Sequence, residues 1–400
     1  MNYESLYKLY YKNPTHYEAI YAERFHSPFT KHLPISIKPF NHTSEYECFY
    51  CYTEETATLQ DKIMSAFFSF YQLIELLPQA GILQFLYTSL IEEIQSSNDI
   101  EGVHSTRKEI QAALESKETM RLSGIVRKYE KIIFHEDIPL KTCQDIRSLY
   151  DDFLADEIKN DDPENLPDGQ LFRKHSVDIV SGTQKVLHRG LYPEQKIIDT
   201  MNKALAILRD PQIPTFIRIA IFHYLFGYIH PFYDGNGRMS RFLTSYLLSK
   251  QLHPTIGLQV SILIKQNRKT YYKLFEEADS AQNKGDLTPF IIGTLEFIYT
   301  AITHTTEILQ QKLDQYTKYR SKLYTLNIKD KTTFRVYDIL LQATVFSNIG
   351  ATVDEIAQAL EKTESTIYSR LKTIPEEKKV VLKDTRPYHY KLNVDWLKSL

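Results

Sequence analysis

The sequence feature that most constrains the fold is the segment of residues 214–229, which would be apolar on nearly every face of a helix. A helix without a polar face has to be buried on all sides by other elements. Only 13 of the 400 residues are glycine, under half of the usual share of about 7%. Few residues are therefore left for the tight turns of a many-stranded sheet protein. We predict a mainly α-helical fold built around this central helix.

The segment that follows, residues 230–241, predicts a tight loop between the central helix and a second helix. It reads HPFYDGNGRMSR. Gly235 and Gly237, on either side of Asn236, allow left-handed backbone angles and bring N–H groups close to a ligand. Because the second helix adds its positive N-terminal end, the loop is typical of a phosphate-binding site.

Four ionisable side chains belong to the same segment. Arg238 and Arg241 lie three residues apart on one helix face, where their charge opposes the helix dipole unless a polyphosphate compensates it. Asp234 offers a hard oxygen ligand for phosphate-bound Mg²⁺, and His230 can take a proton near neutral pH. Taken singly, each has a structural alternative: a helix cap for His230, a turn for Asp234 and solvent exposure for the arginines. Their occurrence together favours a catalytic site.

The same segment resembles, at every fixed position, the HxFx[D/E]GNGRxxR motif of the Fic family of AMP-transferring enzymes. The resemblance extends over residues 85–295 and implies a Fic-type helical core. It also implies a protein adenylyltransferase, which moves AMP from ATP to a Ser, Thr or Tyr hydroxyl of a target protein. Related Doc kinases replace the two glycines of GNG with Ala and Lys, so adenylyl transfer is favoured over phosphoryl transfer. The target is unidentified, and the chain itself is one candidate.

The resemblance assigns a role to each residue of the motif. His230 would be the general base, Asp234 would hold Mg²⁺ or Mn²⁺ on the α- and β-phosphates, and Phe232 would pack inward. The remaining residues would bind the phosphates of ATP. Gly235, Asn236 and Gly237 would form an anion hole, and Arg238 and Arg241 would contact the β- and γ-phosphates.

Two further segments resemble parts of the family's nucleotide and target sites. Residues 167–193 predict a β-hairpin. Within them, residues 169–180, with Phe172-Arg173 and Val177, look like the family's flap, which positions the target's hydroxyl segment by main-chain pairing. Tyr271 and Tyr272 match a segment that covers the nucleotide. A tyrosine pair in an amphipathic helix is as often part of the core, and this alternative stays open.

An upstream segment, SNDIEG at residues 97–102, resembles the inhibitory [S/T]xxxE[G/N] motif of N-terminally inhibited Fic proteins. The resemblance implies regulatory roles for Ser97, Glu101 and Gly102. We predict that Glu101 pairs with Arg241 and fills the space of the γ-phosphate with its own negative charge. A Ser and a Glu four residues apart are otherwise common on a solvated helix face.

The sequence divides into three parts. Residues 1–75 predict an irregular arm or short strands, followed by the first helices. Residues 76–325 predict the Fic catalytic core with its inhibitory helix, and residues 332–400 resemble a winged helix-turn-helix domain. Residues 361–400 are only mildly basic, so DNA binding, protein docking and dimer formation all remain open for this domain.

The cysteines and the apolar segments indicate in which cell compartment the protein is expected. Cys48, Cys51 and Cys143 are too few for a disulfide framework, and the first two lack nearby partners for zinc. Without a signal peptide or a membrane-spanning segment, we expect a cytoplasmic protein with no membrane partner.

Two alternatives to an AMP transferase are left open by the sequence. One is a DNA-binding regulator that contacts DNA through residues 332–400 and uses the Fic core as an ATP sensor. The other is a de-AMPylase, in which Glu101 orients a water for removal of AMP. A homo-oligomer is compatible with each of these functions.

Overall fold

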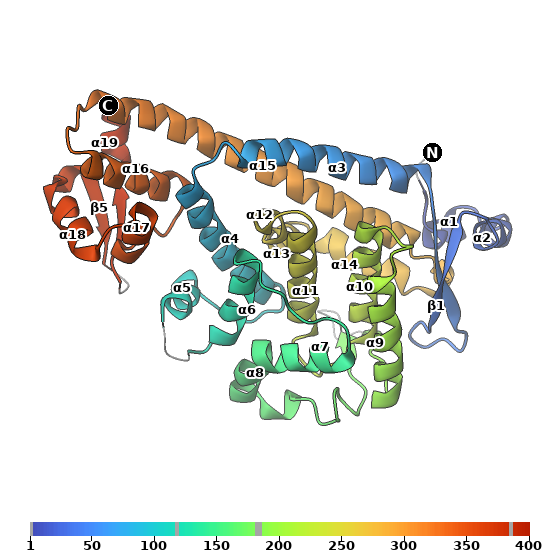
Figure 1. Ribbon diagram of the computed structural model, residues 1–400. Helices are drawn as coiled ribbons and strands as arrows, with labels where there is room; N and C mark the ends of the chain where they lie inside the picture. The colour runs from blue at the N-terminus through green and yellow to red at the C-terminus, as the bar shows by residue number, and fades with distance from the viewer. Residues whose placement is uncertain (1–2, 117–119, 181–185, 384–386) are drawn as a thin grey trace.

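The computed structural model describes residues 3–116, 120–180, 186–383 and 387–400. Helices predominate within these residues, and the strands form three two-stranded sheets. Figure 1 shows a helical body with a long pair of helices along one edge and a smaller group of elements at the C-terminal end. The prediction of a mainly α-helical fold is confirmed. Within the described ranges, none of the helices has the length and apolar character that a membrane crossing requires.

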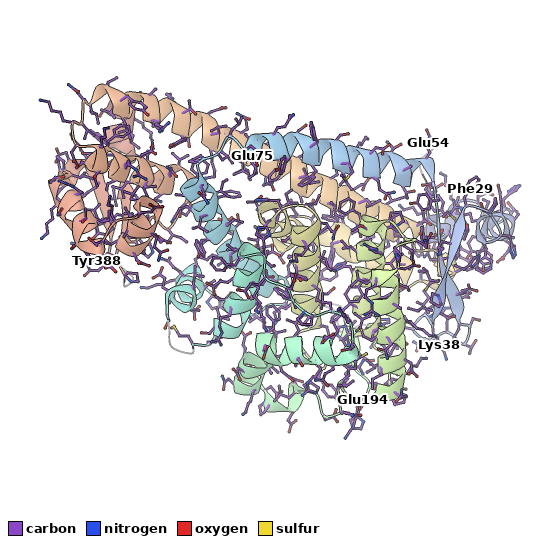
Figure 2. The ribbon with its side chains drawn as sticks, in the orientation of Figure 1. Phe29, Lys38, Glu54, Glu75, Glu194 and Tyr388 are labelled. Atoms are coloured by element: carbon purple, nitrogen blue, oxygen red, sulfur yellow. The ribbon has the colours of Figure 1, made fainter. Side chains whose placement is uncertain are left out.

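The first part of the chain is more regular than the sequence predicts. It forms α1 (Leu6–Lys12), α2 (Tyr17–Phe25) and an antiparallel pair of β1 (Thr30–Ile37) and β2 (Tyr46–Cys51). Phe29 and Lys38 lie at the two ends of β1 (Figure 2). The short strands are therefore present as predicted, but the segment before them is helical rather than irregular.

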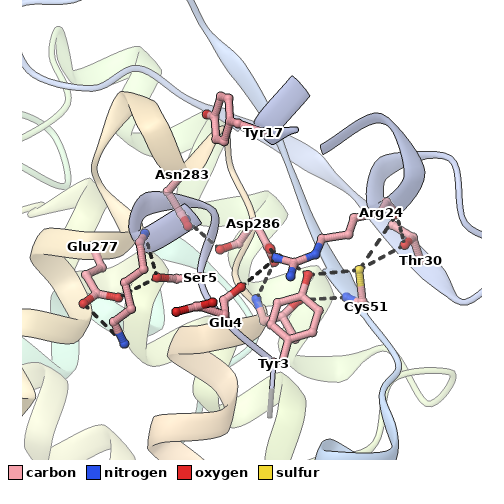
Figure 3. A network of polar contacts seen from close by, with 12 residues as sticks. Tyr3, Glu4, Ser5, Tyr17, Arg24, Thr30, Cys51, Glu277, Asn283 and Asp286 are labelled. Carbon is pink, nitrogen blue, oxygen red and sulfur yellow. Dashed lines mark hydrogen bonds and ion pairs between the residues drawn. The ribbon is translucent and has the colours of Figure 1, made fainter. Parts of the chain in front are cut away.

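A buried carboxylate, Asp286, ties these N-terminal elements to the body. It accepts a hydrogen bond from the Tyr3 hydroxyl at 2.7 Å and lies 3.5 Å from the guanidinium of Arg24. Arg24 also donates to the main-chain carbonyl of Glu4 at 2.9 Å, which joins α2 to the residues before α1. Figure 3 shows these contacts with the neighbouring polar groups.

The long helix pair consists of α3 (Glu54–Ile74) and α15 (Thr288–Thr325), which pack against each other. A capping box at Thr53 begins α3, and Glu54 and Glu75 mark its two ends in Figure 2. In Figure 1, α15 continues past α3 to the C-terminal elements. This helix therefore links the body to residues 331–400.

The central helix predicted from residues 214–229 is α10 (Thr215–Ile229), and most of its side chains are buried. It packs against α9 (Glu194–Arg209), α11 (Asn236–Gln251) and α15. The other helices of the body, in chain order, are α4 (Gln79–Ile100), α5 (Arg107–Glu115), α6 (Ser123–Ile133), α7 (Cys143–Tyr150), α8 (Asp156–Asp161), α12 (Pro254–Gly257), α13 (Val260–Gln266) and α14 (Arg268–Ala278). A π-helical turn at Asp151–Ala155 joins α7 to α8, and short 3-10 turns lie at Pro163–Asn165 and Ala281–Asn283.

The hairpin predicted within residues 167–193 is present. β3 (Asp178–Val180) pairs antiparallel with β4 (Val186–Arg189). The backbone N–H of Gly190 adds a bond of 3.0 Å to the carbonyl of Val177, at the base of the hairpin.

The C-terminal elements pack against α4. They are α16 (Lys331–Phe346), α17 (Val353–Leu360), α18 (Glu364–Thr373), a 3-10 turn at Glu376–Lys378, the strand pair β5 (Lys379–Leu382) and β6 (His389–Leu392), and α19 (Val394–Ser399). The side chain of Gln84 donates to Glu355 at 3.3 Å, and that of Thr88 donates to Ser347 at 3.3 Å. One end of α4 therefore contacts this group of elements, and the other end leads to Glu101.

Candidate active site

The candidate site begins where α10 ends. His230 follows the last residue of the helix and adopts a left-handed backbone conformation, with φ of 50°. Such a conformation is uncommon for a residue with a side chain. The His230 N–H still donates to the carbonyl of Phe226 at 3.0 Å. The chain therefore leaves α10 at His230 and turns into the loop that leads to α11.

The side chain of Asn236 holds this loop closed. Its Oδ1 accepts from the N–H of Phe232 at 2.9 Å, and its Nδ2 donates to the Phe232 carbonyl at 2.8 Å. Phe232 is buried and stacks on Tyr150 with ring centroids 3.8 Å apart, so it packs inward as predicted. Asn236 therefore contributes its side chain to the loop, and only its backbone N–H is left for an anion.

The N-terminus of α11 presents unpaired backbone donors. Gly235 caps the helix with φ of 81°. The first backbone hydrogen bond of the helix is donated by the N–H of Met239 to the carbonyl of Gly235, at 2.9 Å. The N–H groups of Asn236, Gly237 and Arg238 have no acceptor among the residues that the structure describes. Free donors and the positive end of the helix dipole together make an anion-binding site.

A carboxylate already lies at this helix end. The Glu101 Oε1 is 2.0 Å from the position that a Cβ at Gly237 would take. The same oxygen accepts from Nη1 of Arg241 at 2.7 Å, so the predicted pair of Glu101 and Arg241 is present. Only glycine at position 237 permits this approach of the carboxylate to the backbone.

Arg241 is held on its other side by α4. Its guanidinium is 1% exposed. Nε donates to the Ser97 hydroxyl at 3.1 Å, and Nη2 donates to the Ser97 carbonyl at 2.9 Å. Ser97 and Glu101 therefore bind one guanidinium from adjacent turns of the same helix, which fixes the last turn of α4 over the start of α11.

Gly102 ends α4 and thereby places Glu101. It has φ of 75°, its N–H bonds to the Asp99 carbonyl at 3.3 Å, and the N–H of Val103 bonds to the Asn98 carbonyl at 3.0 Å. This pair of bonds is the Schellman arrangement, in which a glycine supplies the left-handed residue. Gly102 thus acts through the backbone.

Arg238, for which a phosphate contact is predicted, pairs with a carboxylate of α8. Its side chain is 3% exposed, and Nη1 donates to Glu157 of α8 at 2.7 Å. Glu157 also accepts from Arg121 at 3.3 Å. Arg238 is therefore paired with a carboxylate that the sequence pattern did not point to.

Asp234 is the accessible carboxylate of the loop, with its side chain 45% exposed. Oδ1 accepts from the Gly235 N–H at 2.5 Å, and Oδ2 lies 3.5 Å from Nη2 of Arg238. No group of three or more His, Cys, Asp or Glu side chains that could enclose a metal occurs in the described part of the chain. A single carboxylate beside an anion site is the donor set that suits Mg²⁺ shared with substrate phosphates.

His230 is half-buried beside two basic groups. Burial, followed by the nearby His188 and Arg173, lowers the pKa of its imidazole to about 3. The imidazole is therefore neutral at physiological pH and able to accept a proton.

The other predicted site residues lie around the loop with different degrees of exposure. Tyr271 is buried, and its hydroxyl is 2.9 Å from Nε2 of His223 on α10, so its ring belongs to the core. Tyr272 is 43% exposed beside Arg268. Val177 directly precedes β3.

Three residues that contact the site or its supports were not singled out by the sequence pattern: Glu157, His188 and His223. His223 carries one signal, since it is a polar side chain inside an apolar helix. The spacing of Glu157 and His188 in the sequence does not distinguish them from other residues. Arg173 belongs to the segment that resembles the flap, but no role was assigned to it.

The fold and the loop define a helical protein with an anion-binding helix N-terminus and a histidine at the end of the preceding helix. Residues 141–248 match the sequence model of the Fic/DOC family. These residues therefore form a Fic/DOC family domain.

Known proteins are similar to this chain over different lengths. Over 72 residues, 18% of this chain, it is 42% identical to "Protein adenylyltransferase Fic" of Drosophila grimshawi and of Drosophila virilis. The match spans only 13% of the length of each relative. The crystal structure of a Fic family protein from Desulfovibrio desulfuricans G20 superimposes with a TM-score of 0.53 at 21% identity, covering 86% of this chain and 98% of that one. This likeness confirms the Fic-type helical fold.

Proposed function

We propose that this chain is a protein adenylyltransferase that moves AMP from ATP to a Ser, Thr or Tyr hydroxyl of a protein. The observation that carries the proposal is the position of the neutral His230 immediately before a loop that ends in free backbone donors at α11. The similarity to proteins named adenylyltransferases supports the same activity.

The chain's own residues account for the main steps. The triphosphate is bound at the N–H groups of residues 236–238 and the arginines next to them. His230 takes the proton of the target hydroxyl as its oxygen attacks the α-phosphorus. The bond between the α-phosphorus and the bridging oxygen of the β-phosphate breaks, and pyrophosphate leaves.

Asp234 is the residue that would hold Mg²⁺ or Mn²⁺, because its carboxylate is accessible and close to the anion site. When bound, the ion neutralises charge on the phosphates of the substrate. Asp234 also orients the start of α11 through its bond to the Gly235 N–H.

Glu101 is proposed to restrain this activity. Its carboxylate is bound to Arg241 and lies against Gly237, so it competes for the donors that a phosphate would use. Inhibition from the N-terminal side, through Ser97, Glu101 and Gly102 on α4, is the regulation that this contact supports.

The reverse reaction, removal of AMP from a modified protein, is a second candidate. Glu101 uses only Oε1 to bind Arg241, and its Oε2 makes no hydrogen bond to any described residue. A carboxylate oxygen left in the site is able to orient a water molecule. Faster loss of labelled AMP from a modified target with the wild type than with Glu101→Gly would support this activity.

DNA binding by the C-terminal elements has weaker support. The order of α16, α17, α18 and the pair β5 and β6 is compatible with a winged helix-turn-helix unit. However, Arg370 lies 3.4 Å from Asp330, and the ammonium of Lys379 donates to the carbonyls of Leu371 and Ile374. Salt-dependent retention of the full chain on DNA, without nucleotide transfer by any variant, would favour a regulator that senses ATP.

The test of the proposed function uses ATP labelled at the α- or the γ-phosphate. Relative to lysate alone, added Glu101→Gly protein should increase the transfer of label from α-labelled ATP to itself or another protein, and should not increase transfer from γ-labelled ATP. Adding His230→Ala should reduce transfer by about 10²–10⁴-fold without loss of ATP binding. His42→Ala is the matched control, because His42 is exposed. An increase in γ-label over lysate alone, or full transfer without His230, would contradict the proposal.

A further inference from the structure

The C-terminal end of α10, which carries His230, is capped by the segment that contains the β3–β4 hairpin. The last carbonyls of a helix have no donors within the helix and need partners elsewhere. Here four consecutive carbonyls accept hydrogen bonds from residues 173–191. Nε2 of His188 donates to the Tyr228 carbonyl at 2.7 Å, and the N–H of Leu191 donates to the Ile229 carbonyl at 3.1 Å. Arg173 donates twice, from Nε to the His230 carbonyl at 2.9 Å and from its backbone N–H to the Pro231 carbonyl at 3.2 Å.

Arg173 makes two of these four bonds and is fully buried. It forms no ion pair with a carboxylate of the described residues. Its guanidinium instead donates to the carbonyls of His230 and His175. A cation is favoured at the negative end of a helix dipole, which explains how α10 accommodates this buried charge.

Gly190 brings the hairpin and the histidine together at this point. A Cβ at Gly190 would lie 2.3 Å from Nη2 of Arg173 and 2.9 Å from Cβ of His230. The base of the hairpin, the guanidinium and the histidine are therefore in contact, with no room for a side chain at position 190.

The segment before Arg173 is fixed as well. The carboxylate of Glu194, at the start of α9, accepts from the N–H groups of Leu171 at 2.7 Å and Phe172 at 2.9 Å. Glu194 is labelled in Figure 2. The backbone that presents Arg173 is thus anchored to a helix of the body and not only to the hairpin.

We propose that Arg173 is a positioning residue for AMP transfer, which holds the backbone of His230 against the base of the β3–β4 hairpin. His230, as the general base, and the edge of the hairpin then move as one unit. An acceptor hydroxyl aligned along that edge therefore meets the imidazole in a fixed orientation. This inference rests on the proposed function, in which His230 deprotonates the acceptor.

The test compares Arg173→Gln and Arg173→Lys, both in the Glu101→Gly background, with α-labelled ATP. Arg173→Gln should lower kcat by about ten- to a hundredfold, since hydrogen bonds from a charged group are lost. The affinity for ATP should not change, because Arg173 does not touch the N-terminus of α11. Arg218→Gln is the matched control, since Arg218 donates to the Asp210 carbonyl at 3.0 Å near the opposite end of α10.

The conservative variant separates positioning from a general loss of structure. The charged or titratable groups that face His230 are Arg173 and His188, and His188 lies 3.7 Å from Asp279. Burial is the main cause of the low pKa of the imidazole, so His230 stays neutral without the cation and the deficit of Arg173→Gln should be the same at pH 6 and at pH 8. Arg173→Lys keeps a cation that can donate to the His230 carbonyl, so its deficit should be smaller. A deficit of equal size in both variants, or one that appears in KM and not in kcat, would overturn the inference.

Two outcomes distinguish this inference from the proposed function. If Glu101→Gly transfers no AMP, the proposed function fails. If Glu101→Gly is active and Arg173→Gln does not slow it, the positioning role fails. Hydrogen exchange tests the geometry without activity: the amides of Gly190, Leu191 and His230 should exchange faster in Arg173→Gln while those of α15 do not, and unchanged exchange would overturn the inference.

Discussion

Arg241 donates to the carboxylate of Glu101 across 2.7 Å, although the two residues are 140 positions apart in the chain. Arg241 lies in the second turn of α11, and Glu101 directly follows α4. Because the same carboxylate lies against Gly237, the contact brings a negative charge to the helix end where the triphosphate is proposed to bind. The two anions therefore compete for one guanidinium and one set of backbone donors.

Removing Glu101 should raise AMP transfer. A charge-assisted hydrogen bond is worth about 1.5–3 kcal/mol, and 1.4 kcal/mol corresponds to about tenfold in rate. We expect Glu101→Gly to label protein about ten- to a hundredfold faster than the wild type, measured as initial rates with α-labelled ATP.

Arg241→Ala and the double variant provide the controls for that comparison. Arg241→Ala removes the partner of the inhibitor and a phosphate ligand together, so it should not copy the gain of Glu101→Gly. Equal labelling by wild type and Glu101→Gly would rule out inhibition by this residue.

Loss of the Ser97 hydroxyl should release the enzyme in part. Ser97 holds Arg241 through its hydroxyl and its carbonyl, and Ser97→Ala removes only the bond of 3.1 Å from Nε. A bond of about 0.5–1.5 kcal/mol predicts a gain of a few-fold to about tenfold in transfer, less than that of Glu101→Gly. Ser96→Ala is the matched control, because Ser96 is the adjacent buried serine and has no bond to Arg241. A larger gain in Ser96→Ala than in Ser97→Ala would refute the assignment.

Transfer should require a divalent cation and the Asp234 carboxylate. Charge neutralisation at a phosphoryl centre contributes several kcal/mol, so we expect EDTA or Asp234→Asn to lower transfer on the order of 10²-fold or more. Stability should change little, since the side chain is 45% exposed. Asp61→Asn is the control, because Asp61 is an exposed carboxylate on α3. Activity that persists in EDTA would remove the metal from the mechanism.

His253 should make the protein less stable in mild acid. Burial, with a smaller effect of His135, lowers the pKa of His253 to about 4, below the value near 6.5 of the unfolded chain. Between pH 6 and 5 the unfolded chain therefore binds a proton that the folded chain does not, and the free energy of unfolding falls as the pH is lowered.

His253→Asn should flatten this dependence. Asn keeps a side-chain acceptor for the Thr255 N–H at the start of α12 and does not titrate. In urea unfolding at several pH values, the slope between pH 6 and 5 should be smaller by up to about 1.4 kcal/mol per pH unit. His42→Asn should leave the slope unchanged, and the same slope in wild type and His253→Asn would show that the imidazole is protonated in the folded protein.

The part of the site that could be predicted from sequence is the part built by neighbours in the chain. The central helix, the glycine loop and the start of α11 follow from residues 214–241, where apolar periodicity and glycine positions act locally. The pairing of Glu101 with Arg241 was also predicted, because opposite charges in two recognised segments indicated a contact.

The supports of the site could not be predicted in the same way. Glu157 and His188 reach the site only because α8 and the hairpin pack against α10 and α11, and no local sequence pattern predicts these long-range contacts. Arg173 lay in the segment that resembles the flap, but its contact with the His230 carbonyl was not predicted. For Tyr271 the sequence left open a place over the nucleotide or in the core, and its hydroxyl lies 2.9 Å from Nε2 of His223 in the core. The sequence indicated that His223 is a polar residue within an apolar helix, but not which residue would be its hydrogen-bond partner.

Gly237 belongs to both competing arrangements, since it lets the Glu101 carboxylate approach the backbone and leaves the same space for a phosphate. A Cβ there would displace the inhibitory carboxylate and would also enter the space in which the triphosphate is proposed to bind. Substitutions that relieve the proposed inhibition and leave the proposed substrate site intact are therefore expected on α4 and not in the loop. For protein engineering, α4 is where the strength of inhibition can be graded while the catalytic loop is left untouched.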